Sequence, residues 1–232
     1  MNGILKKLLE WLILPAIIVL LVVVVVNSIM KPVNFNKERD ARKEVAIQQL
    51  KDIRTLEVAY KSATGRFTAD LDSLKDFYEN GKMSIVMQVG SADDSLAWAH
   101  TEAIKKAHRG KMKPEDFLKL YEAGDQNLVF SVENKIPVKD TIFASRKDFD
   151  INNLKYIPFS DGDEVIMDAI VKTVSGVPVP LFEAKIPYRS LLKGMDNQLR
   201  INLDAECRDM NRYEGLQVGS ITAPNNNAGN WE

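Results

Sequence analysis

The residues of this 232-residue chain that could most readily act as metal ligands or nucleophiles are two histidines and a single cysteine. His100 and His108 are eight positions apart on one expected helix. Their side chains would then lie about 12 Å apart, too far to bind one metal ion directly. We expect both to be solvated. Cys207 has no partner for a disulfide within the chain, and we expect it to be a small packing residue.

A first acidic cluster, Asp148-x-Asp150-x-Asn152, begins like an EF-hand calcium loop. Asn153 stands where the loop needs a turn glycine, and Phe159 stands where it needs a bidentate glutamate. The EF-hand interpretation therefore fails.

A second acidic cluster, Asp161-Gly162-Asp163-Glu164, forms a tight turn before an expected strand. Oxygen-rich turns can hold Ca²⁺, so Asp161, Asp163 and Glu164 are candidate calcium ligands. The alternative is an exposed turn with solvated carboxylates. Apart from this possible Ca²⁺, the sequence predicts no cofactor.

Sequence motifs of the common enzyme classes are missing. The chain has no G-x-S-x-G, H-E-x-x-H, C-x-x-C, Walker loop or G-x-G-x-x-G. Its 31 basic and 32 acidic residues nearly cancel, which argues against nucleic-acid binding. We expect a non-enzymatic protein. A membrane-tethered hydrolase that uses its acidic residues is a minor alternative without an interpretable carboxylate pair.

An apolar segment at the N-terminus must position whatever follows it. Trp11–Met30 contains no charged residue and, as a helix, would span about 30 Å, the thickness of a bilayer's hydrocarbon core. No small-x-small cleavage site follows, so we expect an uncleaved single span in residues 1–30 rather than a signal peptide. Lys6 and Lys7 before the span, against five basic residues soon after it, do not decide the orientation.

Residues 31–82 predict an amphipathic helix and a short second helix. Pro32 predicts a break after the span, and Asn36 a cap for a helix over 37–63 that Gly65 closes. A one-sided apolar stripe on that helix can pack on the chain's own sheet or meet a neighbouring subunit. Its candidate contact residues are Val45, Ala46, Leu50, Ile53 and Tyr60. Thr68 or Asp70 caps the short helix, which ends at Gly81.

The remaining chain divides into a helical insert (residues 83–127) and a β-rich part with a C-terminal tail (residues 128–232). The insert contains helices at 94–109 and 114–123. Strands are expected at 128–132, 140–145, 154–159, 164–174, 177–187 and 199–203, with a hairpin turn at 174–177. Pro178, Pro180 and Pro187 place their strand at a sheet edge or limit its paired length. The last ten residues predict an extended tail. The fold class is α+β.

Residues 48–77, QQLKDIRTLEVAYKSATGRFTADLDSLKDF, resemble the type IV pilins and the major pseudopilins of type II secretion. The similarity is carried by Tyr60, Gly65, Arg66, Phe67, Leu71 and Leu74. It implies an N-terminal transmembrane helix that continues into an amphipathic helix packed on a small antiparallel sheet, with the folded part in the periplasm. It also implies calcium in a loop of that part. The prepilin cleavage spacing is missing around Gly3, so we expect the anchor to be retained.

Together these observations predict a single-pass protein of the cell inner membrane that assembles with itself or with other envelope proteins. The competing hypothesis is a tethered binding module that captures a polypeptide or a small ligand through its β-rich part.

Overall fold

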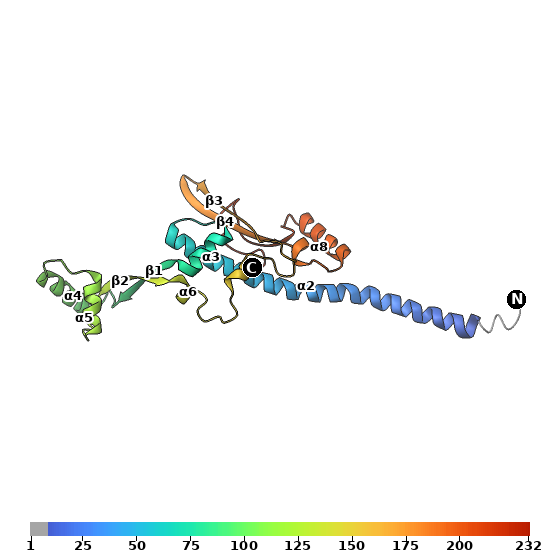
Figure 1. Ribbon diagram of the computed structural model, residues 1–232, viewed down its shortest axis with the longest axis horizontal. Helices are drawn as coiled ribbons and strands as arrows, with labels where there is room; N and C mark the ends of the chain where they lie inside the picture. Colours follow the sequence, from blue (N-terminus) through green and yellow to red (C-terminus); the bar gives the residue numbers. More distant parts are fainter. Residues whose placement is uncertain (1–8) are drawn as a thin grey trace. The chain divides into compact units, whose positions relative to one another are not determined.

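The computed structural model describes residues 9–232 and is α+β, with one long N-terminal helix and two small antiparallel sheets (Figure 1). Gly3, Lys6 and Lys7, on which the predictions of cleavage and orientation rest, lie outside the described residues. The described chain divides into two units: unit 1 contains residues 9–54 and 152–232, and unit 2 contains residues 55–151. The predicted fold class is confirmed at this level.

The N-terminal helix passes through Pro32 without a break. A π-helical turn, η1 (Leu9–Ile13), leads into α2 (Leu14–Thr64), which has 51 residues. The predicted break at Pro32 and new helix start at Asn36 are therefore wrong. A proline inside a helix removes one backbone hydrogen bond and costs about 3 kcal/mol, which the long helical segments on both sides can outweigh.

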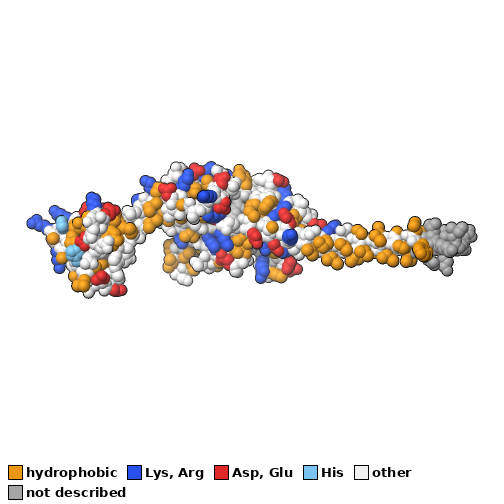
Figure 2. All heavy atoms as spheres, turned by 90° about the horizontal axis from the view of Figure 1, so that it is seen from below, with side chains coloured by type: hydrophobic (Ala, Val, Ile, Leu, Met, Phe, Trp, Pro, Cys, Tyr) orange, Lys and Arg blue, Asp and Glu red, His pale blue; other side chains and the backbone are white. Residues whose placement is uncertain are grey.

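The first part of this helix is bare. No side chain from Trp11 to Met30 is buried, and Figure 2 shows hydrophobic side chains over the visible face of this part. By length and composition, Trp11–Thr64 is the one helix among residues 9–232 that could cross a membrane. This is consistent with the predicted single-pass anchor.

Unit 1 contains a three-stranded antiparallel sheet. Its strands β3 (Ile166–Val174), β4 (Val177–Pro187) and β5 (Gly215–Gly219) lie in the order β3-β4-β5. Ser175 and Gly176 have φ angles of 52° and 83°, as the predicted tight hairpin turn between β3 and β4 requires. β5 pairs with β4 only over Glu183–Pro187, so the half of β4 that carries Pro178 and Pro180 is paired on one side. β4 is the central strand, so the predicted edge position is wrong, whereas the limited pairing near Pro178 and Pro180 agrees with the other alternative.

Three predicted strands are wrong, two of them in unit 1 and one in unit 2. Residues 199–203 lie in α8 (Asn197–Asp209), whose N-cap Asp196 accepts a hydrogen bond from the backbone of Leu199. Residues 154–159 follow a 3₁₀ helix, η2 (Ile151–Leu154), and contribute one isolated bridge. Residues 140–145 begin in the short helix α6 (Val138–Thr141). Five or six alternating residues do not distinguish a strand from a helix, and of these segments α8 alone has a side-chain cap.

The C-terminal segment packs on β5 and is not an extended tail. Asn230 accepts a hydrogen bond from the Gln217 backbone through Oδ1 and donates one to the Gly215 carbonyl through Nδ2, at 3.1 and 2.9 Å. Val218 and Gly229 form a bridge. The prediction relied on the lack of apolar periodicity, but hydrogen bonds of the Asn230 side chain hold this segment on β5. Between β4 and α8 lies the short helix α7 (Tyr188–Leu191).

Unit 2 begins with the last turns of α2 and continues through α3 (Leu71–Asn80), β1 (Lys82–Val89), α4 (Ser95–Ala107), α5 (Pro114–Glu122), β2 (Phe130–Pro137) and α6. Asp70, one of the two predicted caps, is the N-cap of α3 and accepts hydrogen bonds from the backbones of Asp72 and Ser73. β1 and β2 pair over their full lengths in a two-stranded antiparallel sheet. The sequence prediction missed β1, which lies inside the predicted helical insert. α4 and α5 confirm the two predicted helices.

Candidate functional site

The strongest candidate for a functional site is the junction within unit 1 where α2 passes from its bare segment into the packed part of the unit. Phe35 is the first buried side chain of residues 11–54. Further along α2, the side chains of Ala46, Leu50 and Ile53 are fully buried. Fully buried side chains of the sheet, among them Phe182 and Ile186, complete the core of this unit. Three polar residues of α2 then hold the helix to the rest of unit 1.

Gln49 is the central contact of this junction. Its Nε2 donates to the carbonyl oxygens of Asn153, Leu154 and Tyr156 at 3.0, 3.0 and 2.9 Å. The Gln49 side chain is buried, and the bond to Leu154 is buried with it. Because one amide group has two hydrogens, these three acceptors share two donors. Gln49 thereby satisfies the backbone of a segment that has little regular structure of its own.

Arg42 lies two helical turns before Gln49 on the same side of α2. Its Nη1 donates to the carbonyl oxygens of Leu191 and Lys193 at 3.2 and 3.0 Å, and its Nε pairs with Glu38 at 2.9 Å. The guanidinium carbon lies 4.8 Å from the centre of the Phe159 ring. These contacts join α2 to the chain between α7 and α8.

Arg54 forms the third contact, with the C-terminal segment. Its Nη1 donates to the Asn227 carbonyl at 3.3 Å and pairs with Glu232 Oε1 at 2.7 Å. The hydrogen bond from Arg54 lowers the pKa of the Glu232 carboxyl below its usual value. From Arg42 to Arg54 the helix rises about 18 Å, so contacts at both ends of this length prevent α2 from pivoting on unit 1.

A sequence signal for this junction existed and was missed. Gln49 lies on the apolar stripe between Ala46 and Ile53, where a polar side chain must find a partner because it becomes buried. The prediction treated the stripe as apolar contacts only. Its carbonyl partners could not be named from sequence, since they lie over 100 residues away.

The predicted partner-contact residues separate into two groups. Ala46, Leu50 and Ile53 are fully buried within the folded chain, so their side chains are not available to a neighbouring subunit. Val45 is 48% exposed and remains available. Tyr60, in unit 2, is half-buried and makes an edge-on contact with Phe77, with ring centres 5.3 Å apart.

The acidic turn does not gather its carboxylates. Asp161, Asp163 and Glu164 are all exposed, and Asp161 and Glu164 pair with Lys193 and Lys155 at 3.5 and 3.8 Å. Within residues 9–232, no three His, Cys, Asp or Glu side chains are grouped so that they could hold a metal ion. The calcium site stays a prediction that this geometry does not support.

His100 and His108 are exposed, as expected, and each ring makes one hydrogen bond. His100 Nε2 lies 2.8 Å from Asp125 Oδ2, and this hydrogen bond lowers the pKa of Asp125. His108 Nδ1 lies 3.0 Å from the Ile104 carbonyl of its own helix. Cys207 is half-buried on α8, and burial raises the pKa of its thiol. The expectation of a packing role for Cys207 agrees with this environment.

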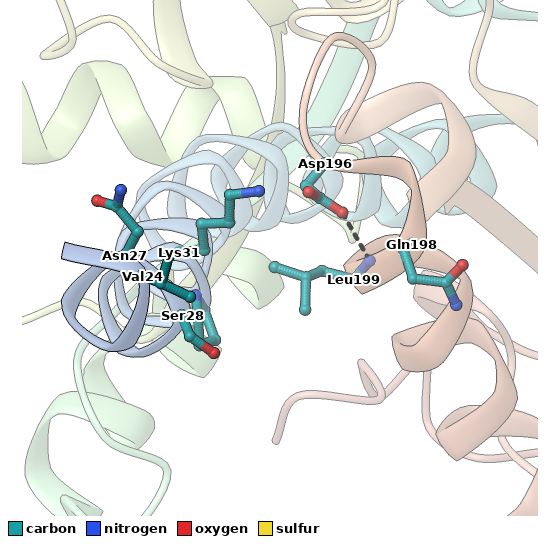
Figure 3. Close-up of a pocket in the computed structure, with 8 residues that line it drawn as sticks. Val24, Asn27, Ser28, Lys31, Asp196, Gln198 and Leu199 are labelled. Atoms are coloured by element: carbon teal, nitrogen blue, oxygen red, sulfur yellow. Dashed lines mark hydrogen bonds between the residues drawn. The ribbon is translucent and has the colours of Figure 1, made fainter. Parts of the chain in front are cut away.

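A groove of about 560 Å³ lies where α2 leaves its bare segment (Figure 3). One wall is formed by α2, with Val24, Asn27, Ser28, Lys31 and Pro32. The other wall is formed by the N-terminal end of α8, from Asp196 to Leu199. Both walls belong to unit 1.

Comparison of the chain with protein-family models, with curated proteins and with solved structures finds no match.

Proposed function

We propose that this protein is a single-pass subunit of the inner membrane, pilin-like in design, that acts by assembly with itself or with other envelope proteins. The observation that supports this most is the unbroken α2. The side chains of Trp11–Met30, in η1 and the first part of α2, are bare, and α2 is then held to the rest of unit 1 by Arg42, Gln49 and Arg54. Such a continuous helix would fix the folded part relative to the segment in the bilayer.

The local geometry of the pilin-resembling segment supports the same proposal. Gly65 has a φ of 81° and its N–H bonds to the Lys61 carbonyl at 2.7 Å, which closes α2. Phe67 is buried with the Lys61 ammonium 4.9 Å from its ring centre, and Leu74 is fully buried. The continuous helix also removes the break at Pro32, where the sequence pattern differed from pilins.

Lateral contact would use the surface that α2 leaves exposed. The bare segment is apolar apart from Asn27 and Ser28, and Val45 is an exposed apolar residue of the same helix beyond it, at 48%. Assembly predicts oligomers of the full chain in mild detergent, visible by cross-linking at micromolar concentration. A strictly monomeric particle would contradict the proposal.

A matched pair of variants makes that experiment specific. Val45 and Val58 are both exposed valines of α2, at 48% and 44%, and their spacing places them about 140° apart around the helix. We expect Val45→Lys to weaken the oligomer and Val58→Lys to leave it unchanged. Equal effects of the two substitutions would remove Val45 from the contact.

The periplasmic placement is tested by labelling a single cysteine. Lys111 is exposed in unit 2, so a Lys111→Cys, Cys207→Ser chain offers one reactive thiol away from the span. We expect a membrane-impermeant maleimide to label it in spheroplasts and not in inverted inner-membrane vesicles. The reverse result would place the folded part in the cytoplasm and contradict the pilin-like proposal.

A second candidate function, a tethered binding module, is favoured by the surface of α4. Leu96 and Trp98 are 81% and 54% exposed there, while the neighbouring core of unit 2 is complete with Phe117, Phe130 and Val132. If capture is the function, Trp98→Ala removes retention of a partner while leaving the oligomer intact. If assembly is the function, Trp98→Ala changes neither.

A further inference from the structure

The groove between α2 and α8 lies at one end of the apolar segment. Its α2 wall runs from Val24, inside the segment, to Lys31, the first charged residue after it. These residues are about 10 Å apart along the helix axis, which matches the depth of the boundary between acyl chains and headgroups. The inference below therefore rests on the proposed membrane span.

The polarity of the groove changes along this axis in the same order as that of a phospholipid. Val24 and Leu199 contribute apolar side chains, and Asn27 and Ser28 contribute polar ones nearer to Lys31. Figure 3 shows the Lys31 side chain extending toward the side of the groove on which Asp196 lies. One wall thus carries a cation and the other an anion.

Pro32 leaves a second acceptor on the α2 wall of the groove. Proline has no N–H, so the carbonyl of Ser28, four residues earlier in the helix, lacks the donor that another residue would supply. Asp196 Oδ1 accepts the Leu199 N–H at 3.0 Å, which leaves its second oxygen for another donor. A group with several N–H donors suits this pair of acceptors.

We propose that the groove binds one phospholipid of the surrounding bilayer whose headgroup carries both a phosphate and a primary ammonium. The phosphate lies near Lys31 and Asn27, the ammonium near Asp196 and the Ser28 carbonyl, and an acyl chain lies along Val24 and Leu199. A groove of about 560 Å³ accommodates the headgroup and glycerol region and leaves the acyl chains in the bilayer. A second copy's apolar span, the main alternative occupant, would leave both charges unpaired.

The test uses the full chain reconstituted in liposomes with a photoactivatable phosphatidylethanolamine. We expect labelled peptides from residues 24–32 and 196–199, with labelling competed by unlabelled phosphatidylethanolamine and not by phosphatidylglycerol. The informative variant is Asp196→Asn, because asparagine keeps the helix cap and removes the charge. Loss of one partly exposed charge contact of about 1 kcal/mol reduces labelling about fivefold. Asp209→Asn, an exposed aspartate at the other end of α8, is the matched control and leaves labelling unchanged.

Three results would overturn the inference: uniform labelling along the span, equal competition by the two lipids, or equal labelling of the Asp196→Asn and Asp209→Asn chains. A cross-link between Leu199→Cys of one copy and Val24→Cys of another would assign the groove to assembly and would also overturn it. Extraction at alkaline pH separates this failure from that of the proposed function. A chain that alkali releases from the membrane has no anchor, whereas an integral chain without groove labelling refutes the lipid site alone.

Discussion

Replacing Gln49 tests whether its amide holds α2 in unit 1. In Gln49→Met the side chain keeps its length and loses both donors, so the Leu154 carbonyl, whose bond to Gln49 is buried, is left without this partner. Such a loss costs about 1–3 kcal/mol, and the two part-buried carbonyls, which water can reach, add about 0.5–1 kcal/mol. The substitution also removes Gln49 Oε1, a buried acceptor for which the described residues provide no hydrogen-bond partner, and this offsets part of the cost. We expect a net loss of about 2 kcal/mol.

Gln49→Glu is the more severe change at the same position. It places two acceptor oxygens where three carbonyl oxygens need donors, so the carboxyl must become protonated to donate even one bond. We expect a loss of about 3–4 kcal/mol at neutral pH. Because this environment raises the folded-state pKa of the new carboxyl, stability is greatest below its unfolded pKa of about 4.3 and falls as the pH rises above that value.

The control for both variants is Gln48→Met. Gln48 is the exposed neighbour and donates to Asp52 within the same helix at 2.9 Å, so its replacement should change stability by about 0.5 kcal/mol or less. Urea unfolding of the full chain in mild detergent gives the free energies. Trp231, which belongs to unit 1, serves as the fluorescent reporter after Trp11→Phe and Trp98→Phe. Equal midpoints and slopes for Gln49→Met and Gln48→Met would refute the role of Gln49.

Three further predictions concern the two units. Burial raises the pKa of Glu57 from 4.5 to about 8, so the native state binds a proton that the unfolded state releases, and stability falls as the pH rises from about 5 to 8. The urea midpoint of Glu57→Gln should not fall with pH in this range. An unchanged pH dependence would contradict the role of Glu57. Asp70→Ala removes the cap of α3 and should cost about 1 kcal/mol by thermal unfolding, against no measurable effect of Asp76→Ala on the exposed surface of the same helix. Asn230→Ala removes two hydrogen bonds to the backbone of β5 and should cost about 1–2 kcal/mol, measured by Trp231 fluorescence. Asn226→Gly, which preserves a positive φ, should not; equal losses would mean that the C-terminal segment does not depend on Asn230.

Local chemistry was readable from the sequence wherever neighbouring residues are sufficient to define a conformation. Twenty uncharged residues define an apolar helix without reference to the rest of the chain. Gly65, Asp70 and the Ser175-Gly176 turn act through bonds to residues within a few positions. These elements were predicted because their causes are local.

The same reasoning failed where local signals conflicted. Pro32 favours a break, but helix-forming segments on both sides determined the outcome. Residues 199–203 alternate like a strand, but the cap at Asp196 and the following helix-forming residues place them in α8. A pattern of five residues carries too little free energy to decide between structures that differ in their long-range contacts.

The sequence by itself determined the apolar N-terminal segment, the amphipathic character of the residues after it and the β3–β4 hairpin, since each follows from side-chain polarity or turn geometry over a short range. Only the tertiary structure showed that α2 is one helix, that Gln49 binds carbonyls of residues 153–156, and that the start of α8 faces the end of the apolar segment across a groove. The last two features join residues that are over 100 positions apart in the chain. Their partners are selected when the whole core is buried, because only then must each polar group on the apolar stripe find its hydrogen bond.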